Sequence, residues 1–179
     1  MVAQSAVERR YDPGAIIFLE GEPCAGLFIV QGGQVRVFKS SLDGREISLH
    51  FAGPGGSFND VAVLDGGPNP ASVQAVEPTV CWVIDRASML RLIEQHPGLA
   101  LAVIEAIASR ARRLVTLVED LTFRSVQARL AKLLLAQATV GADNRGEMLR
   151  ARWLTQQEMA TQLGTVREVV GRALKGLEA

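Results

Sequence analysis

The chain has few cysteines and no long apolar run, and each shortage excludes a class of protein. Of 179 residues, only Cys24 and Cys81 are cysteines, too few for a disulfide scaffold or for the four thiolates of an all-cysteine iron–sulfur cluster. Both are expected to be reduced, packed thiols. No apolar run approaches the roughly 20 residues that a membrane span needs. The first residues also lack the features of a signal peptide, so we expect a cytoplasmic protein without a membrane partner.

Recognisable catalytic motifs are also missing. The sequence contains no Gly-x-Ser-x-Gly, P-loop, His-Glu-x-x-His or Cys-x-x-Cys pattern, and its two histidines, His50 and His96, are 46 residues apart. Asp60 and Asp65 are two nearby carboxylates, but they lie in a turn-rich segment where capping or solvated roles are commoner. We therefore predict that the protein is not an enzyme and has no catalytic or metal site.

What is present is enough apolar sequence for a core, and a charge asymmetry between the two halves. Hydrophobic residues make up 48% of the chain and charged residues 21%, which favours a folded protein over a disordered one. Residues 1–108 hold seven Lys/Arg and twelve Asp/Glu, whereas residues 109–179 hold twelve and seven. The net charges of −5 and +5 indicate a polyanion such as nucleic acid as the partner of the second half.

The first half has the sequence pattern of a β domain. Short apolar stretches, several alternating with period two, are separated by Gly, Pro and Asp turn signals. These stretches occupy residues 15–19, 26–30, 34–38, 46–51, 72–76 and 80–84. Their regular spacing predicts an antiparallel β-roll resembling a jelly roll over residues 1–97, and with the helices that follow the fold class is α+β.

From Pro97 onwards the sequence pattern is typical of a helix. A helix over residues 98–121 would be about 36 Å long, too long for so small a β domain to cover on all sides. Its apolar positions are spaced by three and four residues in a heptad seam: Ile104, Ile107, Ala111, Leu114, Val118 and Leu121. We predict a dimerisation helix whose second stripe, with Val103 and Leu117, lies on the roll; the alternative is one broad core-facing helix. Three arginines off the seam are expected on a solvated face: Arg110, Arg112 and Arg113.

Residues 122–179 are predicted to form a third, helical domain. A joint at 122–125 precedes a helix over 126–138, and a polar loop at 141–146 ends that helix. Thr155 with Glu158, and Thr165 with Glu168, each match the capping box that starts a helix. Gly164 lies between the two starts and suits a tight turn. This spacing predicts a helix-turn-helix.

The packing and the exposed face of this motif can also be read from its residues. Ala160 is small where the helices would cross, and a shared core is expected from Met159, Leu163, Val170 and Leu174. The second helix presents Arg167, Glu168 and Arg172 at or near its N-terminal end, the end that enters a major groove. Arginine can pair with guanine and a carboxylate with cytosine. The alternative is that Glu168 only caps its helix and pairs with Arg172.

Together these features resemble the cyclic-AMP receptor and fumarate-nitrate reductase regulator family over essentially the full chain. The residues Arg167-Glu168 and Gly171-Arg172 are similar to that family's recognition helix. The resemblance implies that Arg167, Glu168 and Arg172 read the bases of a TGTGA-like half-site, with Gln157 and Thr165 beside phosphates. It also implies a homodimer that binds double-stranded DNA and contacts RNA polymerase. Family members follow the recognition helix with a two-stranded wing, and the sequence is expected to lack that wing after Leu177-Glu-Ala179.

Residues 53–73 resemble the family's phosphate-binding cassette, which holds the cyclic nucleotide. The resemblance implies an effector site formed by Phe58, Asn59, Asp60, Asn69, Pro70, Ala71, Ser72, Leu114 and Val115. Two departures argue against ordinary cyclic-AMP binding. Asp60 replaces a longer glutamate, and Asn69 replaces the arginine that pairs with the cyclic phosphate, while no Lys or Arg lies between Arg45 and Arg86. A buried phosphate without a cation costs several kcal/mol.

Four interpretations of the effector remain open at this point. One is a small non-nucleotide effector in an apolar pocket, since Leu114 and Val115 stand where relatives offer hydroxyls to adenine. Another is haem, with His50, His96, a cysteine or a chain-terminal group as axial ligand. The domain could also be a scaffold without a ligand, or could hold a cyclic nucleotide through backbone amides. The predicted function is a ligand-responsive, sequence-specific transcription regulator; the alternative is a regulatory ligand-binding module without effective DNA binding.

Overall fold

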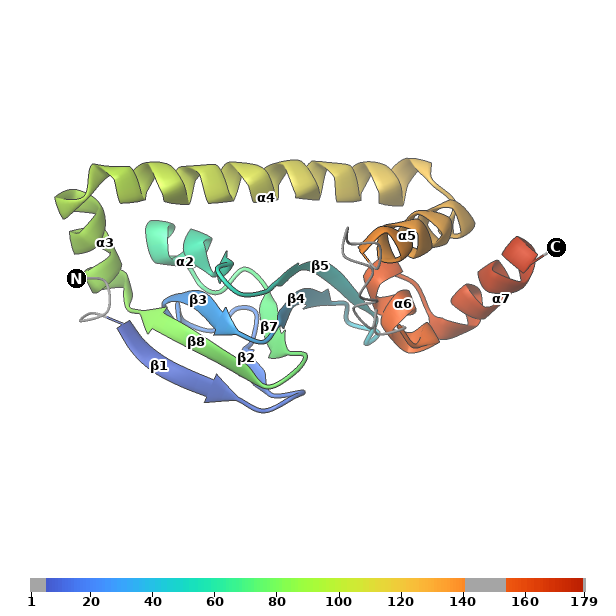
Figure 1. The fold of residues 1–179 in the computed structure, drawn as a ribbon, viewed down its shortest axis with the longest axis horizontal. Coiled ribbons are helices and arrows are strands. Elements are labelled where there is room, and N and C mark those ends of the chain that lie inside the picture. The colour runs from blue at the N-terminus through green and yellow to red at the C-terminus, as the bar shows by residue number, and fades with distance from the viewer. Residues whose placement is uncertain (1–5, 141–153, 179) are drawn as a thin grey trace, which may run out of the picture. The chain divides into compact units, whose positions relative to one another are not determined.

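The computed structural model describes residues 6–140 and 154–178 (Figure 1). These residues form two compact units, each described by itself below. The first unit takes residues 6–39 and 49–114 and contains most of the β structure and most of the long helix. The second takes residues 40–48, 115–140 and 154–178, which include the C-terminal helices.

Within the described residues, eight strands form two four-stranded sheets. The first sheet has the order β1 (Ala6–Tyr11), β8 (Thr79–Ile84), β3 (Leu27–Gly32) and β6 (Ser57–Phe58). The second has the order β2 (Ile16–Phe18), β7 (Ser72–Ala75), β4 (Val35–Ser40) and β5 (Glu46–Ala52). Strand β8 pairs antiparallel with both β1 and β3, and β7 does so with both β2 and β4. The predicted antiparallel β-roll is confirmed.

The core of the roll is built from the alternating apolar positions of these strands. Val35 and Val37 are buried on β4 while Arg36 between them is not, as the pleat of a strand requires. Three phenylalanine rings meet in this core: Phe28 stacks on Phe58 with 4.8 Å between centroids, and Phe18 lies 5.4 Å from Phe28. Cys81 is a free thiol buried there, and burial raises its pKa to about 11. It is a packed thiol, as its sequence context predicts.

Two strands and a helix were missed by the sequence pattern. β1 carries the sequence Ala-Val-Glu-Arg-Arg-Tyr, and its four central residues are exposed because it lies at the edge of its sheet beside β8 (Figure 1). Charged edge strands lack the apolar alternation on which strand prediction depends. β6 is only two residues long. The N-cap of helix α3 (Arg86–Gln95) is Asp85, whose carboxylate accepts a 2.9 Å hydrogen bond from the Ser88 amide.

Two further helices complete this part of the fold. α2 (Asp60–Asp65) is a short helix directly after β6, and α4 (Pro97–Phe123) is one continuous helix (Figure 1). A second core cluster holds Leu27 of β3, Val63 of α2 and Met89 of α3, and Val103 of α4 packs against it. The expected contact of Val103 with the roll is therefore present. No residue of α4 is fully buried, and exposed apolar side chains lie along it: Leu101, Ile104, Leu114, Val115, Val118, Leu121 and Phe123.

The second unit contains α5 (Val126–Val140), α6 (Gln156–Leu163) and α7 (Arg167–Glu178). Their shared core has Leu130, Met159, Ala160, Leu163 and Val170 buried, with Leu174 packed at its side. The predicted helix-turn-helix core is confirmed. The predicted polar loop at 141–146 lies outside the described residues. In the described part of the chain, no helix combines the length and the hydrophobicity needed to span a lipid bilayer.

The turn between β3 and β4 provides a test of the roll. Gly33 has φ +81°, and a Cβ added there would lie 2.3 Å from the Pro78 carbonyl oxygen. Gly44 has φ +78°, but nothing lies within 4 Å of an added Cβ. We expect Gly44→Ala to cost only the backbone strain, about 1–2 kcal/mol, and Gly33→Ala to cost about 1–3 kcal/mol more through overpacking. Urea unfolding of both variants measures the difference, and equal losses would contradict the close approach.

Candidate functional site

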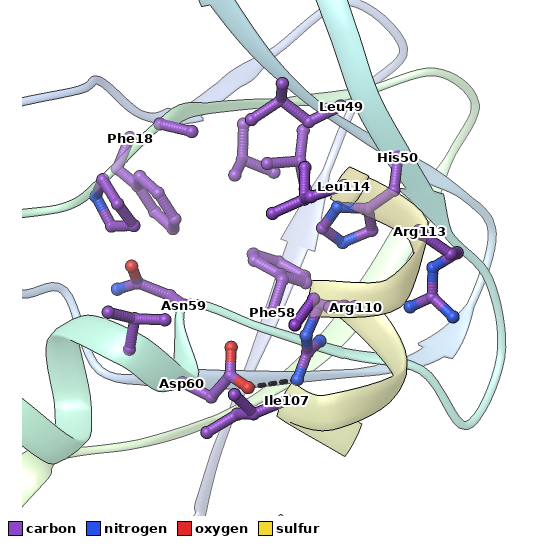
Figure 2. Close-up of a pocket in the computed structure, with 16 residues that line it drawn as sticks. Phe18, Leu49, His50, Phe58, Asn59, Asp60, Ile107, Arg110, Arg113 and Leu114 are labelled. Carbon is purple, nitrogen blue, oxygen red and sulfur yellow. Dashed lines mark hydrogen bonds and ion pairs between the residues drawn. The ribbon is translucent and has the colours of Figure 1, made fainter. Parts of the chain in front are cut away.

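The first unit encloses a cavity of about 230 Å³ between the roll and one face of α4. Strands β2, β4, β5, β6 and β7, the turn into α2 and the middle of α4 all contribute to its lining (Figure 2). Most lining side chains are hydrocarbon, and the polar ones are few. The lining consists of Phe18, Val37, Leu49, His50, Phe58, Asn59, Asp60, Val61, Pro70, Ala71, Val73, Ile107, Arg110, Ala111, Arg113 and Leu114.

An ion pair joins α4 to the start of α2 at this cavity. The Arg110 guanidinium donates to the Asp60 carboxylate and to the backbone carbonyl oxygen of Ser57, as the dashed line to Asp60 in Figure 2 shows. The two side chains of the pair are only 15% and 6% exposed. The interpretation of Arg110 as part of a solvated face is therefore wrong. Arg110 pairs with a residue 50 positions earlier in the chain, so its charge is balanced within the protein.

The two asparagines of the cassette support its backbone. Asn59 has φ 66°, in the left-handed region that asparagine tolerates better than most residues, and it stands at the N-terminus of α2. Its Nδ2 donates to the Gly26 carbonyl oxygen at 3.0 Å and to Asn69 Oδ1 at 2.9 Å. Asn69 is 1% exposed, and its own Nδ2 donates to the Leu19 carbonyl oxygen. The Asn69 amide thus ties loops together and does not line the cavity.

His50 is an imidazole at the same end of the cavity as Arg113. Its Nε2 atom is buried and has no hydrogen-bond partner. Burial, together with the positive charges of Arg110 and Arg113, lowers the pKa of His50 to about 4. The imidazole is therefore neutral at pH 7, because the site is positively charged and partly shielded from water.

The structure brings most of the predicted effector residues together. Phe58, Asn59, Asp60, Pro70, Ala71 and Leu114 line the cavity. Three others do not line it: Asn69, Ser72, whose hydroxyl accepts from the Glu20 amide at 3.0 Å, and Val115, whose side chain is largely exposed. The sequence analysis missed the roles of Arg110, Arg113 and the surroundings of His50. Arg110 lies one helical turn before Leu114, so the predicted position of Leu114 in the effector site already indicated that Arg110 faces the same site.

The lining offers little to a haem iron. His50 is the one imidazole among the lining residues, and none of them is a cysteine. His96 lies at the end of α3, and Cys81 lies in the core of the roll. In the described part of the chain, no group of three or more His, Cys, Asp or Glu side chains is arranged to hold a metal ion. A haem in this cavity would therefore have to find its second axial ligand elsewhere.

The second unit contains the helix-turn-helix. The Thr155 hydroxyl accepts from the Glu158 amide at 3.2 Å and the Glu158 carboxylate accepts from the Thr155 amide at 2.7 Å, so the first predicted capping box is present. Gly164 ends α6 with φ 64°, which confirms the predicted tight turn. The second capping box is wrong by one position. The Val166 carbonyl oxygen accepts the first helical bonds, from Val169 and Val170, so α7 begins at Arg167 and Thr165 is not its cap.

The side chains expected to meet DNA lie on the outside of this unit. Arg167, Glu168 and Arg172 of α7 and Gln157 of α6 are exposed, and Thr165 in the turn is half-buried. Within the described residues, no ion pair joins Glu168 to Arg172. The ends of three side chains on α7 are thus accessible from solvent, close to the end of the helix where backbone amides are unpaired.

The titration of His50 provides a test of the cavity's charge. In the unfolded chain a histidine has a pKa near 6.5, whereas in the folded chain the pKa of His50 is about 4. The unfolded state therefore takes up the proton first, so the contribution of His50 to stability is full above about pH 6.5 and declines as the pH falls towards 4. The facing charges are Arg110 and Arg113, with Asp60 bound to Arg110.

We expect the wild-type protein to lose more stability than His50→Gln between pH 7 and pH 5, as measured by urea unfolding at each pH. The two proteins should differ in slope there, because carboxylates titrate equally in both. An NMR titration of the His50 ring protons with a midpoint near 6.5 would contradict this assignment.

Two family models match the chain. The family model described as the cyclic nucleotide-binding domain matches residues 8–96, and that described as the Crp-like helix-turn-helix domain matches residues 128–179. The CRP-like cAMP-activated global transcriptional regulator of Mycobacterium tuberculosis is 33% identical over 162 residues, covering 90% of this chain and 72% of that protein. The Cyclic AMP receptor protein of Thermus thermophilus is 34% identical over 177 residues, covering 98% and 79%.

A solved structure extends the likeness to the fold of the whole chain. The c-di-GMP responsive global regulator CLP of Xanthomonas campestris superposes with a TM-score of 0.86, covering 99% of this chain and 88% of that one, at 22% identity. Both domain types, their order and the fold therefore coincide. The chain belongs to the cyclic-AMP receptor and fumarate-nitrate reductase regulator family, whose members are ligand-responsive, DNA-binding transcription regulators that act as dimers and not enzymes.

Proposed function

We propose that this protein binds a near-palindromic operator as a homodimer and reads each half-site with α7. The observation that carries the proposal is the exposure of Arg167, Glu168 and Arg172 on a helix whose partner, α6, is capped and packed against it. Arginine pairs with guanine and a carboxylate accepts from cytosine, each good pair discriminating by about 1–3 kcal/mol. Gln157 and Thr165 are proposed to contact phosphates, which position the helix without reading sequence.

The proposed dimer contact is the apolar seam of α4. Ile104, Leu114, Val118 and Leu121 are all exposed along this helix, although apolar side chains of this size usually lie against another surface. Their spacing of three and four residues suits a two-stranded coiled coil around a two-fold axis. Such a dimer presents its recognition helices about 34 Å apart, one turn of the duplex, and requires half-sites at that spacing.

The proposed response to an effector passes through α4. Ile107, Arg110, Ala111 and Leu114 of this helix line the cavity, so a bound ligand contacts the same helix that carries the dimer seam. A ligand shifts an equilibrium only by its difference in affinity for the two states. We propose that it favours one arrangement of the paired helices, and that the break at residues 124–125 between α4 and α5 passes this on to the DNA-binding unit. A regulator of this kind acts on promoters, so we also propose a cytoplasmic location and contact with RNA polymerase.

Base reading is tested by Arg167→Ala. We expect this change to weaken binding to a duplex selected from a random pool by about 1–3 kcal/mol and to leave affinity for random duplex almost unchanged. Gln157→Ala serves as the matched control, because loss of a phosphate contact weakens both duplexes alike. Gel-shift titrations at two salt concentrations measure both affinities. Equal losses on the two duplexes for Arg167→Ala would rule out base reading.

The dimer contact is tested by a charge on the seam. Ile104 is 60% exposed on α4 and Val7 is 56% exposed on β1, so the two side chains are about equally accessible but belong to different elements. We expect Ile104→Glu to give monomers in sedimentation velocity and to lose operator binding at least tenfold, because two carboxylates would meet across the seam. Val7→Glu should remain dimeric. A dimer that persists in Ile104→Glu at micromolar concentration would place the contact elsewhere.

A further inference from the structure

Hydrocarbon side chains form most of the cavity lining, and its polar side chains are Asn59 and Asp60 at the start of α2, Arg110 and Arg113 on α4, and His50 on β5. Phe18, Val37 and Val73 present hydrocarbon from three different strands. In the view of Figure 2, Phe18 lies on the side opposite His50 and Arg113. Asn69, which would be the polar group of the cassette, is fully engaged by Asn59 and by two backbone contacts. This hydrocarbon lining therefore suits the apolar body of a ligand, whereas Asn59 Oδ1, a buried acceptor without a partner, is available to a donor group on the ligand.

The other end of the cavity holds a positive charge that is not neutralised. Arg110 is paired with Asp60, so its charge is balanced within the protein. The Arg113 guanidinium donates to the Ser109 hydroxyl at 2.8 Å, and in the described part of the chain no carboxylate forms an ion pair with it. His50 is neutral and its buried Nε2 atom has no partner. An acidic group at this end would meet a guanidinium and an unused imidazole nitrogen.

A second hollow adjoins the cavity at the same end. It has a volume of about 370 Å³ and lies between the glycine-rich turn at residues 53–57 and the face of α4 that carries Ser109. His50, Arg110 and Arg113 line both hollows. This second hollow is more open and more polar than the first, so an anionic group held at these residues keeps part of its hydration. The desolvation that makes a fully buried anion costly is thereby reduced.

We infer that the effector is a non-nucleotide amphipathic organic acid, with its apolar body in the cavity and its acidic group at Arg113 and His50. This inference rests on the proposed function, because it names the class of ligand to which the regulator responds. A neutral apolar molecule would leave the buried His50 Nε2 atom without a partner and would gain nothing from the exposed Arg113 guanidinium. A strongly polar anion would gain nothing from the phenylalanine and valine side chains.

The test uses two fluorescent probes that share one body. 1-Anilinonaphthalene-8-sulfonate carries an anionic group, and N-phenyl-1-naphthylamine has the same rings without it. We expect the protein to bind the sulfonate at one site per chain and at least tenfold more tightly than the amine. Arg113→Gln should weaken the sulfonate about tenfold and leave the amine unchanged. Arg112→Gln is the matched control, since Arg112 neighbours Arg113 but does not line the cavity, and it should change neither affinity.

The position of the probe is measured separately, so the result does not depend on a cavity-filling variant that could fail to fold. Intermolecular NOEs should join the probe rings to the methyl groups of Leu49 and Val73. NOEs to Ile104 or Val118 of the α4 seam would overturn the assignment, and so would equal affinity for the two probes or no binding of either. Displacement of the sulfonate by micromolar cyclic AMP would overturn the non-nucleotide class.

The two proposals can fail independently. If the wild-type protein still selects an operator in the gel shift but does not distinguish the two probes, only the ligand class is wrong. If the probes behave as expected but no operator is selected over random duplex, the proposed DNA-binding function is wrong while the acid site stands.

Discussion

The ion pair between Arg110 and Asp60 is the interaction on which the effector-binding half depends. It joins the long helix to the turn that starts α2, and it forms part of the wall of the cavity between them. Because both side chains are largely removed from water, neither charge is tolerated without the other, and the loss of one partner of such a pair costs about 3–5 kcal/mol. The cavity and the part of α4 that lines it are therefore one structural unit.

The positive charges at the cavity come from α4 and not from the cassette. A neutral amide, Asn69, occupies the cassette position and is used to brace neighbouring loops, whereas Arg110 and Arg113 supply the cations from α4. The same helix exposes the apolar seam that we assign to the dimer. A ligand that contacts these arginines thus contacts the element that a second subunit would also contact, which is the physical requirement for coupling ligand binding to dimer geometry.

The DNA-binding unit depends on interactions of shorter range. Its first helix is started by Thr155 and Glu158, three residues apart, and it is ended by Gly164 in a conformation that other residues adopt with difficulty. Such signals lie within a few positions of one another, so the sequence predicts them well. The predicted cap at Thr165 was wrong because the spacing of a hydroxyl and a carboxylate does not fix where the turn ends. The backbone of the turn places the Val166 carbonyl oxygen where it accepts the first hydrogen bonds of α7.

The sequence by itself determined the antiparallel roll, the continuous helix with its apolar seam, and the helix-turn-helix, because alternation, heptad spacing and capping are all local patterns. It did not reveal β1, whose charged residues form an edge strand only because β8 lies beside it. Nor did it reveal the partner of Arg110, since Asp60 is 50 residues away and no local pattern joins them. Only the tertiary structure, by packing α4 over the start of α2, decided which charges meet at the cavity and which one remains for a ligand.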